Sequence, residues 1–195
     1  MLVLISLLLL LPQENDPATT KEAMQRVQLV VGAWKVAAVP KGTKEEAWIE
    51  RHEWSFTIEK DEFSLRLVVT DGKMLKEGDL GYDLKRNLYR FRVIRIDGKE
   101  SVFEGKLRER ELALDEVVEK GAEQQRIEFQ LLRENRHLIS IEKRKAGRES
   151  FLMTHSFGCT KEGVPFLRGE MPKCVVTGGA GAIAVRHGGK TYYVC

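Results

Sequence analysis

The feature that most constrains this chain is a two-residue alternation of apolar and polar side chains, repeated in short segments. Trp34, Val36 and Ala38 form the apolar side of the first segment, which ends at Pro40 and Gly42. Alternate side chains of a β-strand point to opposite faces, so each segment predicts a strand that buries one side only. The later segments are centred on residues 54–58, 63–69, 89–93, 102–107, 110–114, 126–132, 137–142 and 150–157.

Short turns separate these segments, with Asp71-Gly72 as one example. Asp-Gly turns join antiparallel neighbours, so the strands should form a meander. A single sheet of eight or nine such strands would leave its apolar face in water unless it closes or packs on a second sheet. We therefore expect a mainly β fold, an antiparallel up-and-down barrel over residues 17–157. A β-sandwich with Trp34 in its core is the alternative.

A short helix should precede the first strand. Asp16 and Pro17 have the residue types of an N-cap and a first helical position. Met24 and Val27 then recur on one helical face, so the spacing predicts a helix over residues 20–31.

Residues 1–11 read MLVLISLLLLL, an unbroken apolar run. A membrane-spanning helix needs about 20 apolar residues, whereas the core of a signal peptide has about 7–15. We therefore expect residues 1–13 to be a secretory signal, which places the mature protein in the periplasm or outside the cell, where disulfides can form. No Lys or Arg precedes the run and no A-x-A cleavage pattern follows it. A core strand or helix at the domain edge is therefore the alternative.

The first strand opens with a Gly-x-Trp tripeptide, Gly32 to Trp34, behind the short helical segment, and a GYD motif at 81–83 precedes the strand that begins near Tyr89. Together with the meander, these motifs resemble a secreted lipocalin-like, calycin-type family of uncharacterised function, over roughly residues 28–157. The resemblance implies a barrel whose floor is closed by Trp34, with no catalytic apparatus.

Four residues are the candidate ligand-binding side chains of this barrel: Trp34, Trp54, Phe91 and His155. His155 lies in a late strand, and in haem-binding lipocalin-like proteins a histidine from a late strand is the axial ligand. The alternative for His155 is a hydrogen-bonded core or rim histidine. Large side chains that should point inward, Phe56 and Phe129 among them, favour a barrel that is filled by its own residues.

After residue 157 the composition changes. Residues 158–172 form a Gly- and Pro-punctuated linker, and residues 173–195 contain two short strand-like segments joined by a Gly-Gly pair. Two such strands around Gly-Gly predict a tight β-hairpin appended to the barrel. Cys159, in the linker, is expected to be structural rather than nucleophilic, since no predicted helix N-terminus lies beside it.

The hairpin has a second resemblance. Residues 189–195, GKTYYVC, together with Cys174, resemble the strand and first cysteine of the YHS/TRASH class of metal-binding modules. The resemblance implies a thiophilic metal, zinc or copper, held by Cys174 and Cys195. A complete site would need a further donor, and His187, His155, Cys159 or a second chain could supply it, with His187 as our choice. Thr177 stands where the second cysteine of the class would be. The alternatives are a truncated module that binds nothing, and a disulfide between the two cysteines.

Charge excludes one class of partner. Lys and Arg number 32 and Asp and Glu 29, a net charge of +3 that is spread along the chain. We therefore expect no nucleic-acid partner. No later segment is apolar enough to span a membrane, and no nucleophile-elbow or metalloprotease motif occurs.

These features predict an exported, non-enzymatic protein that binds a small apolar molecule in the barrel and a thiophilic metal at the tail. The alternative is a structural or interaction module with a solid barrel core and no ligand. An enzyme would need titratable groups that converge in a cleft.

Overall fold

The computed structural model describes residues 16–60, 62–163, 183–187 and 190–194. The chain divides into two units, residues 1–163 and 164–195. In the second unit the described part is an antiparallel hairpin, β11 (Ile183–His187) with β12 (Lys190–Val194), in which Ile183 pairs with Val194. Cys174 and Cys195 lie outside the described residues, and so does the predicted linker beyond residue 163.

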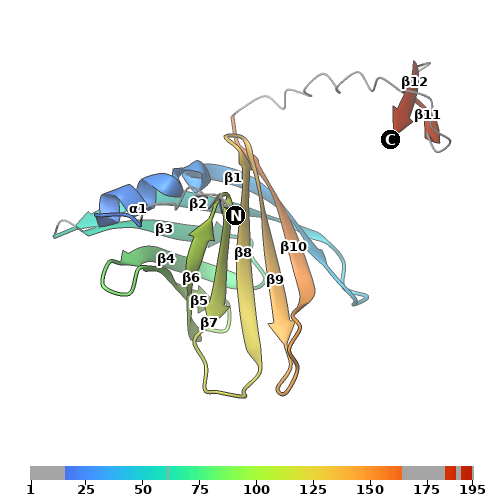
Figure 1. Ribbon diagram of the computed structural model, residues 1–195. Coiled ribbons are helices and arrows are strands. Elements are labelled where there is room, and N and C mark those ends of the chain that lie inside the picture. The colour runs from blue at the N-terminus through green and yellow to red at the C-terminus, as the bar shows by residue number, and fades with distance from the viewer. Residues whose placement is uncertain (1–15, 61, 164–182, 188–189, 195) are drawn as a thin grey trace, which may run out of the picture. The chain divides into compact units, whose positions relative to one another are not determined.

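The described residues of the first unit form a closed barrel of ten antiparallel strands. Consecutive strands are neighbours throughout, and β1 pairs with both β2 and β10, which closes the sheet (Figure 1). The strands are β1 (Gly32–Pro40), β2 (Trp48–Glu59), β3 (Glu62–Thr70), β4 (Leu75–Asp83), β5 (Leu88–Arg95), β6 (Glu100–Arg108), β7 (Glu111–Glu116), β8 (Gln124–Arg133), β9 (Arg136–Arg144) and β10 (Leu152–Lys161). The predicted up-and-down barrel is confirmed, and closure excludes the sandwich. Lipocalins have eight strands, two fewer than this barrel.

The additional strand is β4, which the alternation of the sequence did not reveal. Its inward side carries a glycine, Gly78, and its pairing with β5 shifts register between Leu75 and Glu77. A bulge of this kind breaks the two-residue period. Gly78 is needed for packing, because a Cβ there would lie 2.6 Å from the ring of Phe91.

The helix begins at residue 20 as predicted but is shorter, and its N-cap differs. α1 spans Thr20–Arg26 and a 3-10 turn, η1, spans Gln28–Val30. Its N-cap is Thr19 and not Asp16, because the Thr19 hydroxyl accepts a hydrogen bond from the Glu22 amide at 3.1 Å. A threonine three residues before a glutamate is the signature of a capping box. This capping box, and not the Asp16-Pro17 pair, sets the start of the helix.

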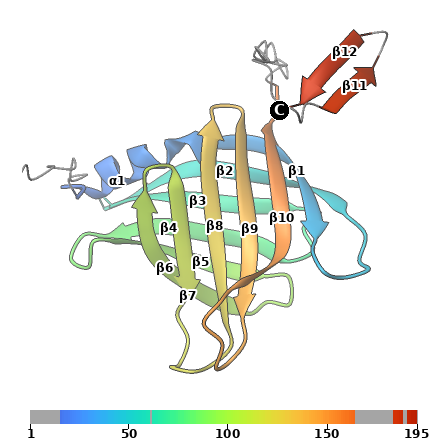
Figure 2. The same cartoon turned by 45° about the vertical axis from the view of Figure 1, so that its right-hand side comes forward.

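Helix α1 and turn η1 cover one end of the barrel (Figure 2). Met24 is fully buried. The Tyr89 hydroxyl donates to the Ala23 carbonyl at 2.8 Å, and the Trp34 indole N–H donates to the Val30 carbonyl at 2.6 Å. These bonds and the apolar contacts fix the helical segment to the strands, with Trp34 at the closed end.

Strand β2 extends beyond the barrel wall, which corrects the expected position of Phe56. Pairing between β1 and β2 ends at Gly32 and Trp54, so the residues of β2 after Trp54 pair with β3 alone. Phe56 is 44% exposed there instead of pointing into the core. Phe129, the other large residue expected inside, is buried.

Strand β10 continues four residues past the predicted end of the barrel at residue 157 and pairs with β1 up to Lys161. Cys159 therefore lies in the barrel wall and is fully buried, with a thiol pKa that burial raises far above its usual range. A thiol held protonated in this way is a structural residue. Among the described helices, none has the length and apolar content of a membrane span.

Candidate ligand-binding cavity

Strand β2 carries a row of polar groups into the apolar interior. Glu50, His52 and Trp54 alternate along the strand, so all three point to the inner face. Their exposed fractions are 5%, 3% and 1%. A buried carboxylate and a buried imidazole on one strand are uncommon in a core and require hydrogen-bond partners.

Glu50 is bonded through both carboxylate oxygens. Its Oε1 lies 2.6 Å from Nε2 of His52, and its Oε2 accepts a hydrogen bond from the Trp48 indole at 2.6 Å. A carboxylate that accepts at both oxygens fixes the hydrogen of the His52 ring on Nε2.

Two nitrogens of this row have no partner. His52 Nδ1 and Trp54 Nε1 are both buried, and neither makes a hydrogen bond within the described part of the chain. A buried polar atom without a partner costs about 1–3 kcal/mol, so such atoms are rare in native cores and are often explained by a bound molecule or a functional role.

A cavity is lined by the side chains that carry these nitrogens. Its volume is about 20 Å³, enough for roughly one water molecule. Apart from Glu50, His52 and Trp54, the lining is apolar and comes from strands around the barrel: Leu67, Met74, Leu75, Phe91, Ile127, Phe129, Ile139, Ile141 and Phe157. The Trp54 ring stacks on Phe91 with 5.7 Å between ring centroids and meets the edge of Phe129 at 6.0 Å.

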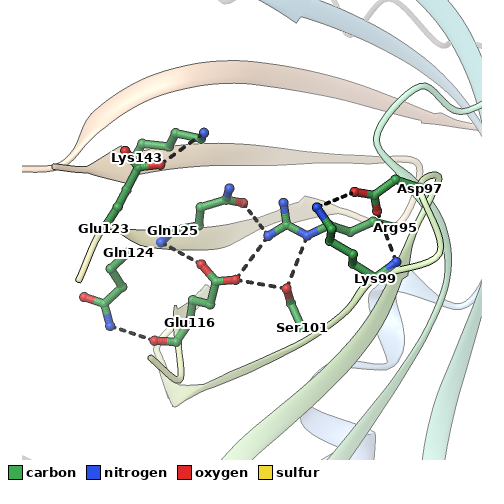
Figure 3. A network of polar contacts seen from close by, with 9 residues as sticks. All are labelled: Arg95, Asp97, Lys99, Ser101, Glu116, Glu123, Gln124, Gln125 and Lys143. Carbon is green, nitrogen blue, oxygen red and sulfur yellow. Dashed lines mark hydrogen bonds and ion pairs between the residues drawn. The ribbon is translucent and has the colours of Figure 1, made fainter. Parts of the chain in front are cut away.

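A polar network braces the end of the barrel opposite α1 (Figure 3). Glu116 accepts hydrogen bonds from Arg95 at 3.1 Å and from Ser101 at 2.9 Å through the same oxygen. Arg95 also donates to the side-chain oxygen of Gln125, and the backbone N–H of Gln125 donates to Glu116. These residues join strands β5 to β8, and each already has partners, which indicates a structural role.

A second histidine, His137 of β9, is fully buried beside Trp34. Their ring centroids are 4.2 Å apart in an edge-on arrangement, and neither nitrogen of His137 has a hydrogen-bond partner in the described chain. Burial is the main cause that lowers the pKa of His137 to about 3, and the electrostatic influence of His52, Arg136 and Lys161 contributes less. His137 is not among the residues that line the cavity.

A larger hollow of about 100 Å³ lies near the start of α1 and is mainly polar. It is lined in part by Tyr82, Asn87 and Tyr89. The Tyr82 hydroxyl bonds the Asn87 side chain, and Tyr89 bonds the helix. Because the hydroxyl groups of Tyr82 and Tyr89 already have hydrogen-bond partners, the interior cavity is the better candidate for a ligand.

The four residues predicted for the barrel site are not brought together. Trp54 and Phe91 stack at the cavity, whereas Trp34 packs at the helix-covered end and does not line the cavity. His155 also lies outside the lining: its ring is partly buried near Trp48, 6.0 Å between centroids, and its Nδ1 is 3.1 Å from the Thr154 hydroxyl. Burial lowers the pKa of His155.

The predicted metal site was Cys174, Cys195 and His187. Both cysteines lie outside the described residues, and for His187 only the backbone position at the end of β11 is described. Within the described residues, no group of three or more His, Cys, Asp or Glu side chains is placed to hold a metal ion.

Sequence reasoning missed Glu50 and His52, although a signal for them was present. The predicted second strand began at Trp54, whereas β2 begins at Trp48. Extending the alternation backward from Trp54 places His52 and Glu50 on the same face as the indole. Two charged or titratable residues on the buried face of a strand are the signal of a polar site.

No family model matches the chain, and no curated protein matches it in sequence. Among solved structures it is similar to Rv2717c from M. tuberculosis, with a TM-score of 0.48 and 12% identity over 72% of this chain and 97% of that one. The description of the barrel therefore rests on its own strand pairing and not on this likeness.

Proposed function

We propose that the protein is an exported, non-enzymatic binding protein whose barrel takes a small, mainly apolar ligand at the cavity beside Glu50, His52 and Trp54. The observation that carries this proposal is that two side chains lining an otherwise apolar cavity each carry a buried nitrogen without a partner in the described chain. Binding sites for small molecules combine apolar walls with a few placed polar groups that orient the ligand.

Export is part of the proposal and is supported by the apolar run at residues 1–11. A thiophilic metal, zinc or copper, at Cys174, Cys195 and His187 is proposed from the sequence of the tail alone. A metal there would need at least one more donor besides these three to complete four-coordinate geometry.

The ligand must enlarge the cavity as it enters. A drug-sized ligand occupies about 300 Å³ or more, whereas the cavity has about 20 Å³. Two lining residues at the turn between β3 and β4, Met74 and Leu75, are only partly buried. Methionine is flexible, so a rotation of Met74 is the expected first step of opening.

The same small volume favours a second candidate function. A barrel filled by its own side chains would serve as a structural or interaction module, with one internal water beside His52 and Trp54. Trp34, Phe91 and Phe103 are large and fully buried, as such a solid core requires.

Native mass spectrometry of protein purified from its own exported fraction distinguishes the two candidates. A ligand binder should carry an additional mass that is lost under denaturing conditions, and the released molecule can then be identified. A native mass equal to that of the polypeptide, unchanged after incubation with hydrophobic extracts of the producing cells, would support the solid barrel and contradict the proposed function.

A further inference from the structure

We infer that the ligand carries a neutral hydroxyl group, an alcohol or a phenol, which is held between His52 Nδ1 and Trp54 Nε1. This inference rests on the proposed function and names the class of molecule that the cavity selects. Both nitrogens belong to side chains that are more than nine-tenths buried and line the same cavity.

The two nitrogens have opposite hydrogen-bonding roles. An indole N–H only donates, so Trp54 requires an acceptor. We take His52 as the imidazole whose single hydrogen lies on Nε2 and is donated to Glu50, and in that form Nδ1 only accepts. A hydroxyl group accepts from one partner and donates to another, so a single oxygen between the two side chains satisfies both.

Charge argues against other head groups. The cavity lining contains the Glu50 carboxylate and, among its described residues, no Lys or Arg. An anionic head group would add a second negative charge in an enclosed site with no counter-charge. A cationic head group would find both Glu50 oxygens already bonded and would leave the Trp54 N–H without an acceptor.

Calorimetric titration with four six-carbon compounds tests the assignment: 1-hexanol, hexane, hexanoate and hexylammonium. We expect 1-hexanol to bind at least tenfold more tightly than hexanoate and hexylammonium. Hexyl methyl ether, which accepts a hydrogen bond but cannot donate one, should bind the unmodified protein several-fold more weakly than 1-hexanol, because His52 Nδ1 then has no donor.

A matched pair of variants isolates the indole N–H. Trp54→Phe removes the unpartnered N–H and retains an aromatic ring. One neutral hydrogen bond corresponds to about a 2- to 12-fold change in affinity, so this variant should bind 1-hexanol roughly fivefold more weakly and hexane less than twofold differently. Trp34→Phe is the control, because the Trp34 N–H donates to the Val30 carbonyl outside the cavity. It should leave the ratio of hexanol to hexane affinity unchanged.

The hydroxyl assignment is wrong if Trp54→Phe weakens 1-hexanol and hexane equally, or if hexanoate or the methyl ether binds the unmodified protein as tightly as 1-hexanol. Binding of hexane without any preference for 1-hexanol would overturn the assignment and leave the proposed binding function standing. If none of the compounds binds and the native mass spectrum shows no ligand, the proposed function fails and this inference fails with it.

Discussion

The barrel interior contains two neighbourhoods in which an indole accompanies a histidine, and they differ in what is left without a partner. Near the helix, the Trp34 N–H is bonded to Val30, and His137 packs on the indole with no hydrogen-bond partner for either ring nitrogen among the described residues. In the middle of β2, His52 is bonded to Glu50 through one nitrogen, and the Trp54 N–H has no partner in the same part of the chain.

The two neighbourhoods differ in whether a cavity lies beside the histidine and the indole. The side chains of His52 and Trp54, which carry unpartnered nitrogens, line a cavity, whereas His137 does not line it. An unpartnered nitrogen beside a cavity can gain a hydrogen bond from a ligand or a water. An unpartnered nitrogen packed against a ring only lowers stability. A buried polar group without a partner therefore indicates a binding site when a cavity lies beside it.

The largest expected effect comes from His137 and depends on pH. Its pKa is lowered to about 3 in the folded protein, against roughly 6.5 in the unfolded chain. Above pH 6.5 the imidazole of His137 binds no proton in either the folded or the unfolded protein, so the free energy of unfolding has its full value. Below it only the unfolded chain binds one, so the free energy of unfolding should fall by about 1.4 kcal/mol per pH unit, roughly 4 kcal/mol in all, towards pH 3. Urea unfolding measured across this range checks the slope.

His137→Leu should flatten that slope, because the variant has no imidazole to protonate in the unfolded chain. His155→Gln is the control and should change it much less, since His155 is only partly buried. If the free energy of unfolding of the His137 variant depended on pH as steeply as that of the unmodified protein, the buried His137 would not be the cause of the pH dependence, and the described difference between the two neighbourhoods would be wrong.

The second effect concerns the carboxylate that distinguishes the cavity neighbourhood. Glu50→Ala should destabilise the protein by about 3 kcal/mol, because it removes the acceptor of the buried His52 ring and of the partly buried Trp48 indole. Glu50→Gln should cost about half as much, since its amide has one acceptor oxygen in place of two. Chemical unfolding at pH 7 measures both. Equal stability of the alanine variant and the unmodified protein would show that the hydrogen bonds of Glu50 with His52 and Trp48 do not stabilise the fold.

The smallest effect compares the two indoles directly. Trp34→Phe and Trp54→Phe remove the same atoms, so the lost packing is similar in both. Only the first leaves a backbone acceptor, the Val30 carbonyl, without its donor. We therefore expect Trp34→Phe to be more destabilising by about 1 kcal/mol in thermal or urea unfolding of the ligand-free protein. The reverse order would mean that the Trp54 N–H already has a partner.

Much of the fold could be predicted from particular residues. The alternation of Trp34, Val36 and Ala38 predicted β1, and Phe91 was correctly placed inside. Strand β4 was missed because Gly78 and a bulge interrupt the two-residue alternation of apolar side chains. Phe56 was misplaced because the sequence around it does not indicate that the pairing of β1 with β2 ends at Trp54. For the site, Trp54 and Phe91 were found, whereas Glu50 and His52 were passed over with the start of β2.

By itself the sequence determined that one-sided strands must close around a shared core, because side-chain alternation is a local property of each extended segment. Only the tertiary structure decided where the cavity lies and which side chains line it. A cavity is the volume left between side chains from strands far apart in the chain, such as Trp54 of β2, Phe91 of β5 and Ile139 of β9. No single segment contains that information, because it arises from packing.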